Sequence, residues 1–229
     1  QVRIRVQDYF LKMKRQEQAI ERQTGAPLPE QLRVYDAEGR MTKKAAARMA
    51  NLDRDHLDPI YEMILSNDLV YKDLSDYLIA MHAKERNDYI RSIDPTNDMG
   101  SGITDQEAIA ILQRIAASGK QAAYDAAADR VRAITRLSLD SQLSSGLISQ
   151  ERYDALANGW QYYVPLRGFE VQYEDDPEFA RSGRGLDVRG PESFKAMGRR
   201  TKSDDPLEYV LMQAYETIIR SEKNTVKKT

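Results

Sequence analysis

Apolar residues recur at intervals of three and four along most of the chain, and this spacing predicts helices. In residues 1–23 a stripe of Val6, Tyr9, Phe10, Met13 and Ile20 is separated from charged positions. Further helices are predicted from Thr42, over 57–69, from Asp73, from Thr104, over 120–142, over 149–157 and after Asp205-Pro206. The pattern therefore predicts an all-α protein, an elongated multi-helix body without a sheet of three or more strands.

Residues with known preferences at helix ends set the expected boundaries. Thr104 and Glu107 form the Thr-x-x-Glu pattern of a capping box, and Ser149 is placed to cap a short helix. Asp58 is predicted to cap a helix with Pro59 at its first position, where the missing N–H costs nothing. Residues 35–40 are expected to be a helix end and a turn, and residues 94–102 a loop.

The pattern changes after Trp160. Residues 161–204 hold most of the glycines and lose the apolar periodicity, which predicts a long arm with little regular structure of its own. The expected organisation is a helical body over 1–160, an extended arm over 161–204, and a C-terminal amphipathic helix over 205–229 that packs on the body or on a partner. Because residues 170–204 cannot build a core, we expect them to be mobile or to lie against another chain.

Composition excludes several classes of protein. Thirty-four basic residues against 36 acidic ones give a net charge of -2, which argues against a nucleic-acid binder that works by bulk charge. The absence of cysteine and the presence of only two histidines argue against disulfides, thiolate sites and a His-rich metal centre, so no cofactor or metal is expected. No stretch approaches the roughly 20 apolar residues that span a bilayer. Because the chain opens with Gln1, we expect it to be a piece of a larger protein.

The densest polar cluster is formed by His82, Glu85, Arg86 and Asn87. On a helix, His82, Glu85 and Arg86 share one face. A histidine beside a carboxylate can act as a general acid or base. A structural cluster that holds neighbouring helices through hydrogen bonds is the favoured interpretation, because structural networks also bring such groups together.

Two further segments carry polar chemistry. Residues 100–102, Gly-Ser-Gly before the Thr104 helix, have backbone N–H groups suited to a phosphate, but there is no P-loop lysine and a plain turn is favoured. In the arm, an acidic block over 170–178 precedes a basic one. The basic residues that are candidates for non-specific nucleic-acid contact are Arg181, Arg184, Arg189, Lys195, Arg199, Arg200 and Lys202.

The start of the arm is rich in aromatic and apolar residues. We expect Trp160, Tyr163, Val164, Pro165 and Leu166 to anchor the arm on the helical body, because aromatics at this density usually lie in a core or an interface. A stacking platform for nucleic-acid bases is the alternative.

Several segments together resemble one family. They are residues 77–87 (Tyr-Leu-Ile-Ala-Met-His-Ala-Lys-Glu-Arg-Asn), 100–108, 162–168, 198–200 and 220–224. They resemble a helical connector region of the large polyvalent proteins of phages and prophages, over roughly residues 30–228. Met81 stands where a polar residue such as Arg is expected, which weakens a catalytic interpretation of His82.

The resemblance implies a context and no reaction. It implies a virion-associated protein that is ejected with the phage DNA, in the virion interior or in the host cell after injection, and in the cytoplasm if expressed alone. The leading hypothesis is a non-enzymatic structural or interaction module that binds other virion proteins or copies of itself through helix faces. The alternatives are a non-specific nucleic-acid-binding module that uses the basic arm, and an enzyme fragment in which His82 and Glu85 form an acid–base pair.

Overall fold

The computed structural model describes residues 14–29, 33–167 and 198–228. In these residues the regular structure is helical, and the one extended pairing is an isolated parallel bridge between Ser101 and Arg199. The predicted all-α class is therefore confirmed. None of the helices described is both long and apolar enough to cross a membrane.

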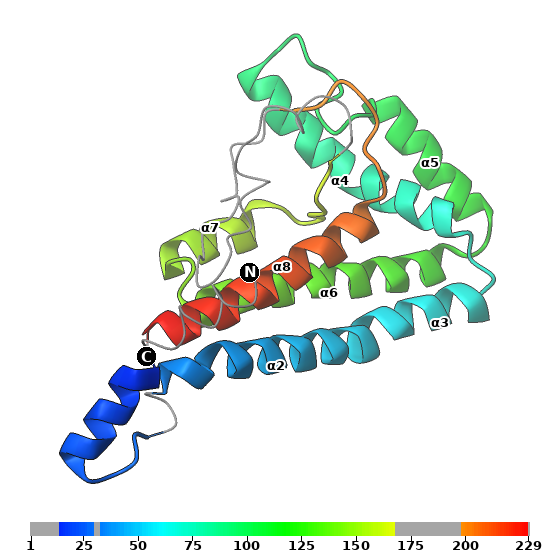
Figure 1. The fold of residues 1–229 in the computed structure, drawn as a ribbon. Coiled ribbons are helices and arrows are strands. Elements are labelled where there is room, and N and C mark those ends of the chain that lie inside the picture. The colour runs from blue at the N-terminus through cyan, green and yellow to red at the C-terminus, as the bar shows by residue number, and fades with distance from the viewer. Residues whose placement is uncertain (1–13, 30–32, 168–197, 229) are drawn as a thin grey trace, which may run out of the picture.

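The helices form an elongated body (Figure 1). Residues 14–24 are helical, and the bundle then comprises α2 (Val34–Leu52), the π-helix η2 (Asp53–Leu57), α3 (Asp58–Ser66), α4 (Tyr71–Ile93), α5 (Asp105–Ala117), α6 (Gln121–Ser145), α7 (Gln150–Gly159) and α8 (Pro206–Lys228). Together, α2 and α3 run along one edge, α6 and α8 lie beside them, and α4 with α5 forms the opposite side (Figure 1).

One main hydrophobic core joins α2, α3, α4, α6 and α8. Its fully buried side chains include Ile60, Leu78, Val131, Ile134 and Leu207, all 1% exposed or less. A second, smaller cluster lies between α4 and α5 and contains Ile79, Ala83, Ile103 and Ala108. Because α4 contributes to both clusters, its side chains are enclosed on several faces, and polar residues on α4 are placed inside the protein.

The helix predicted from Thr42 begins earlier, and the turn predicted over 35–40 is wrong. Residues 34–52 are one helix with Gly39 inside it. A glycine in a helix costs about 1 kcal/mol relative to alanine, but Ala37, Met41 and Ala45 bury one face of this turn at 8% exposure or less. Burial of that face outweighs the local preference of the glycine.

Asp58 does not cap a new helix, which corrects the predicted boundary. The backbone stays helical through Leu57, and the Asp58 N–H donates to the carbonyl of Asp53 across a π turn. A proline inside a helix has no N–H to donate and collides with the carbonyl four residues earlier. The wider turn over Asp53–Leu57 accommodates Pro59, so η2 connects α2 to α3 without a break.

Other helix ends lie where the sequence predicts them. The capping box is confirmed, since the Thr104 side chain accepts from the Glu107 N–H and the Glu107 carboxylate accepts from the Thr104 N–H at 2.7 Å. Ser149 Oγ accepts from the Arg152 N–H at 3.2 Å. Residues 94–102 form the expected loop.

Candidate functional site around His82 and Arg86

The predicted polar cluster lies in the middle of α4, where the chain after α7 crosses it. His82 is 1% exposed. Its Nδ1 lies 2.6 Å from Glu85 Oε1, one helical turn away. The Glu85 carboxylate also accepts the backbone N–H groups of Gln161 and Tyr162, each at 2.9 Å. Glu85 therefore links α4 to the residues that start the arm.

Burial decides the charge states of this pair. Loss of hydration lowers the pKa of His82, and the neighbouring Glu85 opposes that shift only in part. The pKa of Glu85 is lowered despite its burial, because His82 and the two backbone N–H groups stabilise the carboxylate. The pair at neutral pH is therefore a neutral imidazole that donates to a carboxylate, and it is a hydrogen bond rather than an ion pair.

Aromatic rings close the space around His82. Trp160 and Tyr163 meet the imidazole edge-on, with ring centroids at 5.4 and 5.8 Å. A general base has to reach the proton that it removes, and a ring that is 1% exposed and enclosed by two aromatic side chains is shielded from a substrate. The geometry suits a structural lock.

The predicted arm anchor, Trp160 and residues 163–166, packs on the helical body. Val164 is 1% exposed, Pro165 is buried, and Leu166 packs against both hydrophobic clusters. Tyr163 is 38% exposed although its hydroxyl end is enclosed, and this enclosure raises the pKa of the phenol. The segment is thus seated by its aliphatic residues, and its aromatic residues lie over α4.

Arg86 differs from the other members of the cluster. Its guanidinium carbon lies 5.9 Å from the centre of the Trp160 ring. Its Nε–H is buried and finds no hydrogen-bond acceptor in the described part of the chain. Loss of hydration lowers the pKa of Arg86, so the site holds a partly dehydrated cation whose compensation comes from an aromatic face.

The Asn87 side chain forms its hydrogen bonds on a different side of α4 from that of His82. It is 0% exposed, and its side chain accepts the Ser101 N–H at 2.7 Å and donates to the Ile103 carbonyl and to Asp105. Asn87 therefore organises the turn at residues 100–102, and the sequence pattern that grouped it with His82 did not separate these two roles.

That turn is occupied by the protein itself. The Ser101 N–H is bonded to Asn87 and the Gly102 N–H to the Met99 carbonyl. Gly102 adopts a φ of +95°, and a Cβ there would overlap the carbonyl oxygen of Thr201. Residues 199–202 thus cover the turn, and the N–H groups of Ser101 and Gly102 are already used within the protein.

The described end of the arm, residues 198–204, packs on this same chain. For these residues this differs from the expectation that 170–204 would be mobile or covered by another chain, because the turn at 100–102 offers backbone partners; residues 170–197 lie outside the described part of the chain. The Arg199 N–H donates to the Gly100 carbonyl at 2.9 Å, and Asn97 donates to the Arg199 carbonyl. The Arg199 side chain donates hydrogen bonds to residues 201 and 202, and Arg200 pairs with Asp94 at 3.4 Å.

The other residues predicted to contact nucleic acid lie outside the described residues; they are Arg181, Arg184, Arg189 and Lys195.

A buried carboxylate that sequence reasoning missed holds this segment. The Asp76 side chain is 9% exposed and lies 2.7 Å from Lys202 Nζ, 2.8 Å from Lys72 Nζ and 3.7 Å from Arg114. Burial alone would raise the pKa of Asp76, but Lys202 and Lys72 keep it low. Only the Lys72–Asp76 pair is visible as an i,i+4 spacing in the sequence.

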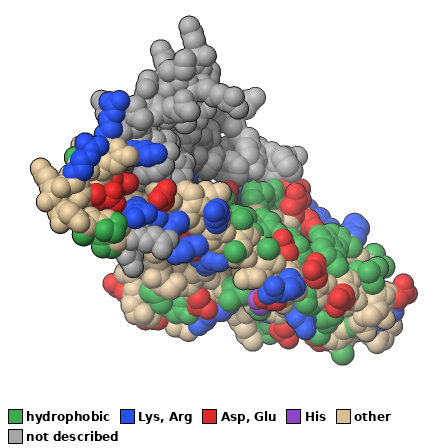
Figure 2. Space-filling view, turned by 60° about the horizontal axis from the view of Figure 1, so that its bottom comes forward, with side chains coloured by type: hydrophobic (Ala, Val, Ile, Leu, Met, Phe, Trp, Pro, Cys, Tyr) green, Lys and Arg blue, Asp and Glu red, His purple; other side chains and the backbone are tan. Residues whose placement is uncertain are grey.

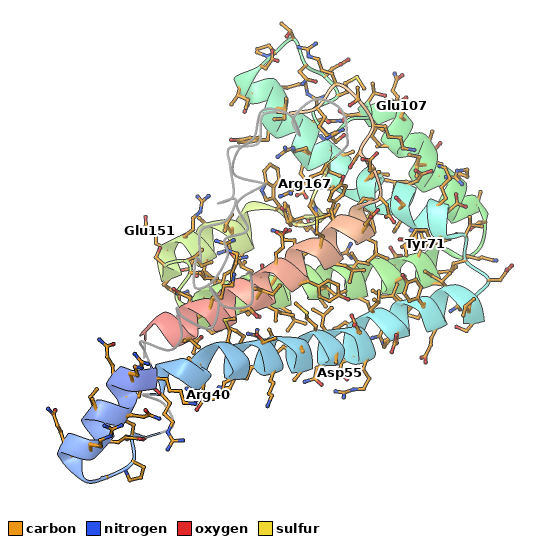
Figure 3. The ribbon with its side chains drawn as sticks, viewed as in Figure 1. Arg40, Asp55, Tyr71, Glu107, Glu151 and Arg167 are labelled. Atoms are coloured by element: carbon orange, nitrogen blue, oxygen red, sulfur yellow. The ribbon has the colours of Figure 1, made fainter. Side chains whose placement is uncertain are left out.

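The two described ends of the arm meet. The Arg167 carbonyl accepts the Ser203 hydroxyl at 2.7 Å and the Asp204 N–H at 2.8 Å. Arg167 lies on the side of α4 that faces α7 and α8 (Figure 3). Arg167 and residues 203–204 therefore lie side by side on the body.

A metal centre and a ligand-binding hollow are two other kinds of site that polar side chains can form. Over residues 14–29, 33–167 and 198–228, no three His, Cys, Asp or Glu side chains are grouped as metal ligands. A hollow of about 250 Å³ lies beside η2, between α2, α6 and α8, and is lined by Arg48, Asn51, His56, Ser138 and Ser141 among others. Arg48 in this hollow is already bonded to Glu222 and Ser141, each at 2.7 Å.

Comparison of the chain with protein-family models, with curated proteins and with solved structures finds no match.

Proposed function

We propose that this chain is a structural and interaction module of a large virion-associated phage protein that is ejected with the DNA, and that it assembles through helix faces. The resemblance to the connector region of large polyvalent proteins supports the phage context. An exposed apolar surface on the described helices supports assembly, and it is the observation that carries the proposal.

This surface, the corner patch, consists of Tyr61, Leu65, Val70 and Tyr71. Their exposed fractions are 43%, 80%, 56% and 39%. Tyr61 and Leu65 are one turn apart on α3, and Val70 and Tyr71 start α4. Figure 2 shows hydrophobic side chains gathered at the end of the molecule where α3 leads into α4. Clustered exposed apolar side chains mark interaction sites more often than isolated ones do.

The corner patch has a fixed shape. The Tyr71 hydroxyl donates to Asp205, just before α8. Burial and the bond to Asp205 raise the pKa of Tyr71, and the nearby Tyr61 adds to this. Figure 3 shows Tyr71 at the start of α4, near the end of α3. A surface held by three helices loses little side-chain freedom when a partner covers it, which favours binding.

The enclosure of His82 supports a module without an acid–base reaction of its own. Its ring is surrounded by Trp160 and Tyr163 and is bonded to Glu85, which is itself engaged by two backbone N–H groups. His82 and Glu85 thus each have a structural partner, and replacing either residue is expected to change the stability of the protein.

The experiment places Leu65→Glu in the gene of a phage that encodes the chain and measures the amount of this protein in purified particles by mass spectrometry. Ile109→Glu is the matched control, because Ile109 is 53% exposed on α5 and lies outside the corner patch. We expect the protein in wild-type and I109E particles and a strong decrease in L65E particles. Absence of the protein from wild-type particles would refute the virion role, and equal amounts in all three would refute the corner patch.

A further inference from the structure

Three arginines stack on aromatic rings of one short segment, residues 153–162. The guanidinium carbons of Arg86, Arg132 and Arg136 lie 5.9, 5.5 and 5.2 Å from the ring centres of Trp160, Tyr162 and Tyr153. Such pairs occur on average about once per 70–80 residues. Three within ten residues form an arginine–aromatic surface, built by α4 and α6 on one side and the α7 segment on the other.

Among the described residues, Arg86 is the member of this surface for which no carboxylate partner is found. Arg132 pairs with Asp129, and Arg136 lies 3.6 Å from Asp140. The Glu85 carboxylate next to Arg86 is committed to His82, Gln161 and Tyr162. Its Nε–H is buried and unbonded in the described structure, so Arg86 carries a dehydration cost. Because the Nε–H itself is closed to a ligand, an anion would offset this cost by pairing with the outer guanidinium nitrogens.

Two more cations lie near Arg86. The charge of Arg199 acts on Arg86 and contributes to its lowered pKa. The charges of Arg167 and Arg86 both act on the Tyr163 hydroxyl, opposing the rise in its pKa that burial causes. Arg86 of α4 and Arg167 at the first described end of the arm therefore place positive charge near Tyr163, and Arg199 acts on Arg86.

The rings beside these cations favour one kind of anion. Trp160 is packed edge-on by Tyr89 at 5.4 Å and by His82, so its orientation is fixed. Tyr163 is 38% exposed. Arginine forks recognise phosphate oxygens, and exposed aromatic faces stack nucleic-acid bases without regard to sequence. A simple carboxylate or inorganic phosphate would use the cation and leave the rings unused.

We propose that Arg86, with Trp160 and Tyr163, forms a binding site for single-stranded nucleic acid, in which Arg86 holds a phosphate and Tyr163 stacks a base. This site goes beyond the proposed assembly role and is independent of the corner patch. Since the surface is small and the chain has a net charge of -2, binding is weak and salt-dependent, in the range of roughly 10⁻⁴–10⁻⁶ M.

Trp160 is the sole tryptophan of the chain, so its fluorescence reports directly on the site. The full chain is titrated with single-stranded oligothymidylate of about 12 nucleotides at low salt, and tryptophan emission is recorded with the anisotropy of a labelled oligonucleotide. Arg86→Gln is expected to weaken binding at least about tenfold, or about 1.4 kcal/mol, and Arg86→Lys to weaken it less. Arg54→Gln is the matched control, because Arg54 is 67% exposed on η2 and pairs only with its neighbour Asp55 in the described structure.

The outcomes separate the alternatives. A change in Trp160 emission on binding, with loss in R86Q and none in R54Q, supports the site. Equal weakening by R86Q and R54Q would show non-specific attraction and overturn it, as would binding without any change in emission. Inorganic phosphate or acetate that reproduces the emission change at the same concentration would reduce the site to one for a simple anion. Circular dichroism and melting of each variant exclude loss of folding, and R86K retains the charge if R86Q does not fold.

Discussion

Glu85 Oε1 lies 2.6 Å from His82 Nδ1 and also accepts the Tyr162 N–H from a segment 77 residues away in the chain. One carboxylate oxygen thus fixes the orientation of a buried imidazole and the path of the chain after α7. Both contacts use the charged form of Glu85 as the acceptor.

Replacing His82 with alanine should lower the free energy of unfolding by about 1–3 kcal/mol, because the Glu85 carboxylate loses a partner in a buried setting. Thermal or urea unfolding followed by circular dichroism measures this. Lys84→Ala is the control on the same helix, since the Lys84 side chain is 77% exposed, and it should change stability by less than about 0.5 kcal/mol. Equal stability of H82A and the wild type would show that the cluster is not a structural lock.

Stability should fall as the pH decreases below the ordinary histidine pKa of about 6.5. His82 has a lowered pKa in the folded protein, so in this range the unfolded chain binds a proton that the folded chain does not. The contribution of His82 to the slope of the unfolding free energy against pH approaches about 1.4 kcal/mol per pH unit, until the pH reaches the pKa of His82 in the folded protein. Urea unfolding between pH 7.5 and 5.5 should show that the unfolding free energy depends less on pH in His82→Gln than in the wild type. An identical pH dependence would contradict a lowered pKa of His82 in the folded protein.

Glu85, whose folded pKa is also lowered, should reduce stability only at more acidic pH, below about 4.5.

Two glycine substitutions should have opposite effects. Gly102→Ala should destabilise the protein by more than about 2 kcal/mol, because alanine is strained at a φ of +95° and its Cβ would overlap the Thr201 carbonyl. Gly39→Ala should stabilise it by about 0.5–1 kcal/mol, since Gly39 is helical and its Cβ would meet open space. Melting temperatures that moved in the same direction for both variants would contradict the described packing.

Lys202→Met should lower stability by about 1 kcal/mol and loosen residues 198–204. Lys202 is half exposed, and Lys72 and Arg114 remain near the buried Asp76 carboxylate, so the loss is smaller than the roughly 3–5 kcal/mol of a fully orphaned pair. Hydrogen exchange of the Arg199 N–H, which is bonded to Gly100, should become faster. Lys44→Met, at an exposed position of α2, is the control; an unchanged exchange rate in K202M would show that the ion pair does not hold the segment.

The sequence by itself determined the helices and several of their ends. Apolar residues at three- and four-residue spacing specify one buried face per helix, and the Thr104–Glu107 capping box acts within three residues. Such features are local, since the hydrogen bonds that satisfy a helix end lie within one turn. The all-α class follows from them and needs no knowledge of which helices meet.

Only the tertiary structure decided how these parts combine. Lys202 reaches Asp76 across 126 residues, Trp160 covers His82, and Asn87 turns to residues 101–105 although it lies beside Arg86 in sequence. The continuous helix through Gly39 likewise reflects burial of Ala37, Met41 and Ala45 that outweighs a local preference of about 1 kcal/mol. Each of these outcomes depends on which side chains pack together over long separations, and residue spacing along one segment does not contain that information.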